Sequence, residues 1–111
     1  MTGNEYQKLA MRTRNRDLNW NEQTFNSCLG LSGEVGEYND LVKKVFFQNH
    51  EISYEDLKKE LGDILWYVAL ACEVWNFNFD DVMELNIDKL KRRYPEGFDG
   101  NLSINRREDD V

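Results

Sequence analysis

This chain of 111 residues has few of the residues that break helices or cross-link a fold. It has a single proline, Pro95, and lacks the clusters of turn residues that separate the strands of sandwiches and barrels, which favours helices. Its two cysteines, Cys28 and Cys72, have no CxxC spacing, so we expect both to be reduced and partly buried, with no disulfide and no bound metal. His50 is the only histidine, which argues against a site built on histidine ligands.

Long apolar runs and an excess of basic residues are missing as well. The longest apolar run, residues 64–72, is too short to span a bilayer, and the polar first residues do not resemble a signal peptide. We therefore expect a cytoplasmic protein with no membrane partner. The net charge of −7 argues against a nucleic acid polymer as a partner. It allows a small phosphorylated ligand, because a bound cation can reverse the local charge, although solubility alone would also explain the acidity.

The apolar periodicity predicts four helices in one domain. Ser53 with Asp56 three residues later is a helix-capping pattern, and Pro95 cannot continue a helix, which fixes two of the boundaries. Short connections between such helices are typical of an antiparallel four-helix bundle in the all-α class. The predicted helices cover residues 5–16, 20–47, 53–75 and about 80–94, and the polar residues after 98 are expected to form a loosely held tail.

The predicted helix 53–75 is apolar on nearly all sides from residue 64 onward. A helix without a polar face must be covered all round, and a chain of this length supplies few partners. This favours a homo-oligomer, a homodimer or homotetramer, with helix 53–75 at the interface. The alternative is a central helix that one bundle covers completely.

Four acids have a spacing that favours a metal site. Glu34 and Glu37 are three residues apart in one predicted helix, and Glu60 and Asp63 are three apart in the next, so each pair shares a helix face. Four facing carboxylates repel one another unless a cation lies between them, and Mg²⁺ prefers oxygen ligands. The alternative is a solvated acidic surface, since the chain has 21 acids.

Glycines beside these acids support the prediction of a metal site. Gly30, Gly33 and Gly36 follow one another at three-residue steps, and Gly62 precedes Asp63. Each glycine inside a helix costs about 1 kcal/mol relative to alanine, so we expect another helix or a ligand to approach closely there.

Basic and aromatic residues offer the other parts of a nucleotide site. Lys89 and Arg93 share a face of the last helix with Asn86, and together they could bind phosphates. The alternative is a surface stripe near the end of that helix. Tyr67 and Trp20 are candidates for stacking on a base, although aromatic residues are more often part of a core.

Three ordered motifs resemble one known family. They are Gly30-Leu31-Ser32-Gly33-Glu34-Val35-Gly36-Glu37, then Glu60-Leu61-Gly62-Asp63-Ile64-Leu65-Trp66-Tyr67, and last Asn86-x-x-Lys89-Leu90-x-x-Arg93-Tyr94-Pro95-x-Gly97-Phe98. Together they are similar to the MazG-like nucleotide pyrophosphohydrolases of the all-α NTP pyrophosphatase superfamily. The resemblance covers residues 5–98 and implies a MazG-like domain at residues 1–98, followed by a polar tail at 99–111.

The resemblance implies an activity and roles for these residues. Members of the family hydrolyse a nucleoside triphosphate between the α- and β-phosphates, giving the monophosphate and pyrophosphate, with Mg²⁺ or in its place Mn²⁺. The carried-over metal ligands and catalytic residues are Glu34, Glu37, Glu60 and Asp63. The carried-over phosphate-binding residues are Asn86, Lys89 and Arg93. Some members have an additional acid where this chain has Gly33, which leaves the number of metal ions open.

Two other functions fit the same sequence. One is a non-catalytic nucleotide-binding or regulatory helical bundle, which would bind a nucleotide without turnover. The other is a structural oligomerisation module, whose melting temperature neither nucleotide nor magnesium would change.

Overall fold

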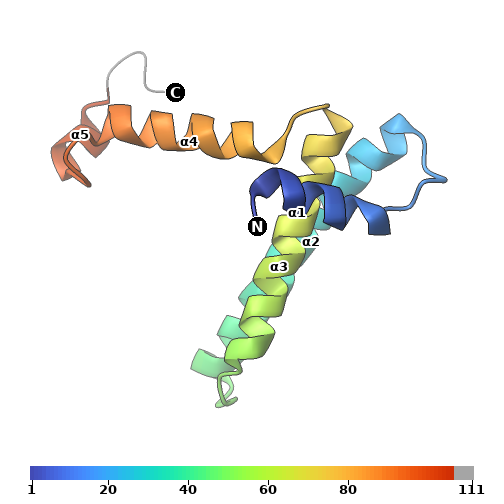
Figure 1. Ribbon diagram of the computed structural model, residues 1–111. Helices are drawn as coiled ribbons and strands as arrows, with labels where there is room; N and C mark the ends of the chain where they lie inside the picture. Colours follow the sequence, from blue (N-terminus) through green and yellow to red (C-terminus); the bar gives the residue numbers. More distant parts are fainter. Residues whose placement is uncertain (107–111) are drawn as a thin grey trace.

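The computed structural model describes residues 1–106, and its regular elements are all helices. Helices α2 (Trp20–Phe47) and α3 (Tyr54–Val74) form a long antiparallel hairpin, which α1 (Gly3–Ala10) and the 3₁₀ turn η1 (Met11–Thr13) cross at one end. Helix α4 (Phe79–Arg93) and the short α5 (Gly100–Ile104) follow and extend away from the hairpin (Figure 1). The predicted all-α class is confirmed.

Local side-chain caps explain where the three long helices begin. The Asn19 side chain accepts a hydrogen bond from the Glu22 backbone N–H, and the Glu22 side chain accepts one from the Asn19 N–H, which makes a complete capping box. Ser53 caps α3 by accepting from the Asp56 N–H, and Asn78 caps α4 in the same way. These bounds confirm the predicted helices at 20–47 and 53–75 and the start of the last helix to within a residue.

The first helix is shorter than the predicted 5–16, because a tertiary contact replaces its last turns. The indole Nε1 of Trp66 on α3 donates to the Ala10 carbonyl oxygen at 3.1 Å and to the Thr13 hydroxyl at 2.8 Å. The Thr13 hydroxyl in turn donates to the same Ala10 carbonyl. The chain tightens into η1 and is extended at Arg14, with φ −69° and ψ 152°. Apolar periodicity could not reveal this ending.

A small core lies where α1, η1, the end of α3 and the start of α4 meet. Gln7 is buried there and ties the corner between α3 and α4 to α1. Its Nε2 donates to the Phe77 carbonyl, and its Oε1 accepts from the Phe79 N–H at 2.8 Å. The buried apolar residues are Met11, Ala69, Leu70, Cys72 and Phe79.

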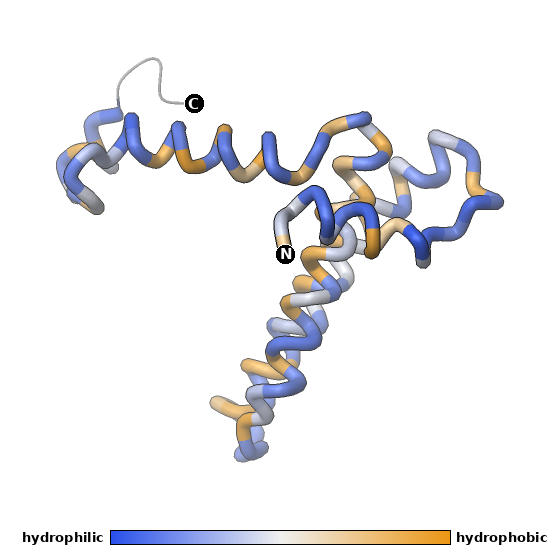
Figure 2. Tube along the Cα trace, viewed as in Figure 1, coloured by the Kyte–Doolittle hydropathy of each residue, from blue (hydrophilic) through white to orange (hydrophobic). Residues whose placement is uncertain are grey.

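The predicted four-helix bundle is not closed within one chain, which corrects that part of the fold prediction. After Phe79 the axis of α4 points away from the hairpin (Figure 1), and beyond Met83, which lies against Gly3 of α1, the helix extends clear of the hairpin (Figure 2). Leu85 is 68% exposed and Ile87 is 49% exposed. The radius of gyration is 17.2 Å, whereas a compact chain of this length has about 13 Å. The corner at residues 76–78 turns α4 outward, and only its first residue, Phe79, joins the buried core with α3.

The predicted tail and the two cysteines differ in part from what the sequence indicated. Residues 100–104 of the predicted polar tail form α5, whose N-terminus Asp99 caps, and the remainder at 107–111 lies outside the described residues. Both cysteines are free, as expected, but Cys28 is exposed and only Cys72 is buried. No helix in residues 1–106 is long and apolar enough to cross a membrane.

Candidate metal centre

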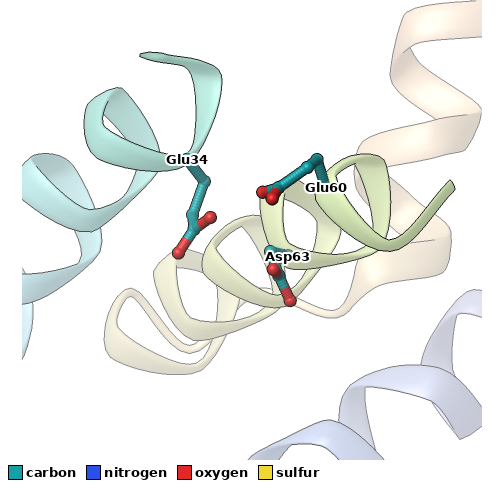
Figure 3. Close-up of side chains that lie close together, drawn as sticks. All are labelled: Glu34, Glu60 and Asp63. Carbon is teal, nitrogen blue, oxygen red and sulfur yellow. The ribbon is translucent and has the colours of Figure 1, made fainter. Parts of the chain in front are cut away.

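Three of the four predicted acids meet between α2 and α3. Glu34 reaches from α2 toward Glu60 and Asp63 on α3, as Figure 3 shows. Each of the three offers a carboxylate oxygen, and these oxygens all lie within 4.8 Å of one another. We call these three residues the acid cluster. Glu60 and Asp63 share a face of α3 because they are three residues apart. The register of the hairpin turns this face toward Glu34 on α2.

The electrostatics of the acid cluster favour a cation. Glu34 and Glu60 are partly buried and Asp63 is exposed. Burial raises the pKa of the Glu34 carboxyl, and the negative charges of Asp63 and Glu60 raise it further. The ionised form of this carboxyl is disfavoured, and a divalent cation bound in place of the proton would stabilise it. Carboxylate oxygens are the ligands that Mg²⁺ and Mn²⁺ accept, so the donor set fits such an ion.

The fourth predicted acid, Glu37, lies beside the acid cluster without joining it. It is exposed on α2, one turn after Glu34, and its oxygens are not among those that converge. Its negative charge nevertheless contributes to the raised pKa of Glu34. Glu37 is therefore a charged neighbour of the acid cluster and not one of the three residues whose oxygens converge.

An aromatic wall stands next to the acids. Glu34, Asp63, Trp66 and Tyr67 line an open cavity of about 330 Å³, which we call the acid cavity. The Trp66 and Tyr67 rings meet edge to face, with centroids 4.9 Å apart and an interplanar angle of 81°. Because Trp66 is also hydrogen-bonded to Ala10 and Thr13, its ring has a fixed position in this wall. The sequence offered both Tyr67 and Trp66 as candidates for base stacking, and the structure places the two rings side by side.

Gly30 makes room for the Tyr67 ring. A Cβ atom at Gly30 would lie 2.0 Å from Cε1 of Tyr67, so a larger residue could not occupy this position without moving the ring. The expected close approach is thus found at Gly30. At Gly33, Gly36 and Gly62, apart from the neighbouring residues and the backbone of the same helix turns, no described atom lies within 4 Å of the corresponding Cβ, so the prediction of a close neighbour there is not met within one chain.

Trp20, the second candidate for base stacking, lies elsewhere. Its Nε1 donates to the Val74 carbonyl at 2.9 Å, and its ring packs against Trp75 at a centroid distance of 5.2 Å. Val74 is eleven residues after Asp63, which is about 16 Å along α3. Trp20 therefore lies at the open end of the hairpin and does not line the acid cavity of its own chain, so its role in base stacking stays a prediction.

The predicted phosphate-binding residues are on α4 and do not meet the acids within one chain. Asn86, Lys89 and Arg93 lie in the second half of α4, the part that extends farthest from the hairpin (Figure 1). Lys89 and Arg93 are partly buried, and Asn86 is exposed. One chain therefore assembles the acidic half of the predicted site and holds the basic half apart from it.

Comparison with known proteins adds an independent finding. The model of the MazG nucleotide pyrophosphohydrolase domain matches residues 23–98, a range that contains the acid cluster, Glu37 and the three polar residues of α4. The Gene 37 protein of Mycobacterium phage L5 is 34% identical over 73 residues, which are 62% of this chain and 64% of that protein.

Two longer relatives match a shorter stretch of the chain. The nucleoside triphosphate pyrophosphohydrolases of Escherichia coli K12 and of Escherichia coli O157:H7 are each 41% identical over 49 residues. These residues are 40% of this chain and 19% of either enzyme, so the chain spans less than two thirds of each of these curated relatives. No solved structure matches the chain.

Proposed function

The chain belongs to the MazG nucleotide pyrophosphohydrolase family, and we propose that it hydrolyses a nucleoside triphosphate between the α- and β-phosphates, releasing the monophosphate and pyrophosphate. The observation that carries the proposal is the convergence of Glu34, Glu60 and Asp63 at the mouth of a cavity with an aromatic wall. A metal-binding acid cluster beside a stacking surface suits a ligand that has both phosphates and a base.

The acid cluster would hold the metal ion that the reaction needs. Glu34, Glu60 and Asp63 supply oxygen ligands, and Mg²⁺ is the ion that fits them together with substrate phosphates, with Mn²⁺ as a substitute. When bound, the ion polarises phosphate oxygens and lowers the pKa of a coordinated water. Without it, these carboxylates would repel a triphosphate, so metal binding also makes the cavity accessible to the substrate.

Other residues of the chain would orient the substrate and move the proton. Glu37, one turn from Glu34 and exposed, is the carboxylate available to accept a proton from the attacking water. The Tyr67 and Trp66 rings offer an apolar face on which the base can stack while the phosphates reach the acids. Lys89 and Arg93, with Asn86 beside them, would bind the charge that develops on the leaving pyrophosphate.

A second copy of the chain would supply these basic residues, because one chain keeps them apart from its acids. The accessible surface is 8572 Å², whereas a compact chain of this size exposes about 6,400 Å². The difference, on the order of 2,000 Å², matches what each partner of an obligate homodimer covers. Much of it is apolar: Leu61 and Leu65 on α3 are each 46% exposed, and Leu85 on α4 is 68% exposed. We therefore include a homodimer or homotetramer, with α3 at the interface, in the proposal.

The direct test is the release of pyrophosphate from a panel of normal and modified nucleoside triphosphates in the presence of Mg²⁺. We expect turnover of at least one of them, and a loss of about a hundredfold or more in Asp63→Asn and in Glu34→Gln, because each removes a metal ligand. Glu55→Gln is the matched control, since Glu55 is exposed on α3 and pairs only with Lys59.

Two results would reject the proposal. Tight binding of nucleotides without any release of pyrophosphate would assign the chain to the non-catalytic alternative. Full activity in Asp63→Asn would show that the acid cluster is not the metal site.

A further inference from the structure

A second cavity, lined by basic side chains, lies beside α1 and shares no lining residue with the acid cavity. It has a volume of about 610 Å³ and is bounded by α1, η1, the end of α3 and the start of α4. Four basic side chains line it, although the chain as a whole has a net charge of −7. We call it the basic cavity, and these residues are Lys8, Arg12, Arg14 and Arg16.

The one acid among the lining residues does not neutralise this cavity, because its own oxygens are already engaged. Oε1 of Glu73 pairs with Nη1 of Arg14 at 3.2 Å, and Oε2 accepts a hydrogen bond from Nε2 of Gln7 at 3.0 Å. In the described part of the chain, Lys8, Arg12 and Arg16 form no ion pair. Three positive charges therefore lie around one space without an internal counter-charge.

Arg14 adds a polar group that lacks a partner. Its Nε is buried, and no described atom accepts a hydrogen bond from it. Buried donors are almost always paired, so this N–H, which has almost no exposed surface, would gain a partner if the guanidinium turned toward an acceptor bound in the cavity. The Glu73 pair engages only the Nη1 side of the same guanidinium and leaves Nε without a hydrogen bond.

We propose that the basic cavity binds a multiply charged phosphate anion, at a site separate from the acid cavity. Arginine forks match phosphate oxygens in geometry and charge, and neutral donors on the wall, such as Asn4 and Asn78, can bind further oxygens. The two cavities differ in one respect that a measurement can detect. The acid cavity needs a cation before it accepts phosphate, whereas the basic cavity attracts phosphate directly.

The test is a calorimetric titration of the full chain with inorganic pyrophosphate in EDTA, which removes divalent cations. We expect saturable binding of one pyrophosphate per chain, which weakens as salt increases. Arg12→Gln and Arg16→Gln should each weaken it about tenfold, since a charge-assisted contact is lost. Both residues are exposed and unpaired within the described chain, so we expect these variants to fold normally. Lys43→Gln, which removes an exposed charge from α2, is the matched control and should bind as the wild type does.

Further variants separate this site from the proposed catalytic one. Asp63→Asn should lose activity but keep pyrophosphate binding in EDTA. The binding test therefore does not depend on whether the proposed catalytic function is correct. No binding in EDTA would overturn the inference, as would binding that Lys89→Gln abolishes and Arg12→Gln leaves intact. A parallel titration with ADP identifies the natural source of the anion: tighter binding than pyrophosphate indicates a nucleotide, and equal binding indicates free diphosphate.

Discussion

The hairpin of α2 and α3 packs within the chain, whereas α4, which is richer in charged residues, extends away from it. Residues Ala69, Leu70 and Cys72 of α3 are buried, whereas in α4 only the first residue, Phe79, is buried. The hairpin holds the acid cluster in place, and α4 holds the basic residues away from it. On the proposed function, one chain preorganises the acidic half of the site, and association would complete it with the basic half.

The largest expected effect tests whether the two halves come from different copies. Asp63→Asn and Arg93→Gln should each lower activity about a hundredfold or more. When the two inactive variants are mixed and allowed to reassociate, half of the dimers are mixed, and one of their two sites has both intact halves. Activity should therefore return to about one quarter of the wild-type level.

Steady-state pyrophosphate release from the mixture, with sedimentation to establish the oligomer, provides the measurement. A mixture of Asp63→Asn with Glu34→Gln is the control, because both changes affect the same half and the mixture should stay inactive. If the first mixture also stays inactive although the chains exchange, each site takes both halves from one copy.

The next effect concerns the stability of the acidic half. The folded-state pKa of Glu34 is raised, so its protonated form favours the folded chain. Without metal, this contribution is fully present below the ordinary glutamate pKa and is lost as pH rises through the raised value. Magnesium binds the deprotonated form and should reverse the trend, stabilising the fold by about 2.7 kcal/mol at a hundred times its dissociation constant.

Thermal unfolding at pH 4.5 and pH 7.5, with and without Mg²⁺, measures this dependence. The stabilisation by Mg²⁺ should be large at pH 7.5 and small at pH 4.5. In Glu34→Gln without Mg²⁺, the melting temperature should depend less on pH than in the wild type. This difference gives the contribution of Glu34 apart from that of the other carboxylates. Equal stabilisation by Mg²⁺ at both pH values would argue that another site binds the ion.

The smallest effect compares two glycines on α2, one that is packed and one that is open. Gly30→Ala should cost about 1–3 kcal/mol and raise the KM for the nucleotide, because its Cβ would collide with the Tyr67 ring of the acid cavity. Gly33→Ala should stabilise the chain by up to about 1 kcal/mol, since alanine favours the helix and nothing described lies within 4 Å. Chemical denaturation and steady-state kinetics measure both. If Gly33→Ala were as destabilising as Gly30→Ala, a second copy must approach α2 at Gly33.

The sequence by itself determined the helices and the composition of the acidic site. Capping residues such as Asn19 and Ser53 act within one turn, so the starts of α2 and α3 could be predicted. The three-residue spacing of Glu60 and Asp63 put both on one face for the same local reason. The early end of α1 could not be predicted, because it depends on a hydrogen bond from Trp66, 56 residues away from Ala10.

The tertiary structure alone decided which predicted residues meet. The register of the hairpin brought Glu34 to Glu60 and Asp63 and left Glu37 beside them, and it placed Trp20 against Trp75 at the other end. The direction of α4 follows from the corner that Gln7 ties to α1, which separates Lys89 and Arg93 from the acids. Helix spacing is a property of neighbours in the chain, whereas the position of one helix relative to another depends on contacts between distant residues, which no local pattern encodes.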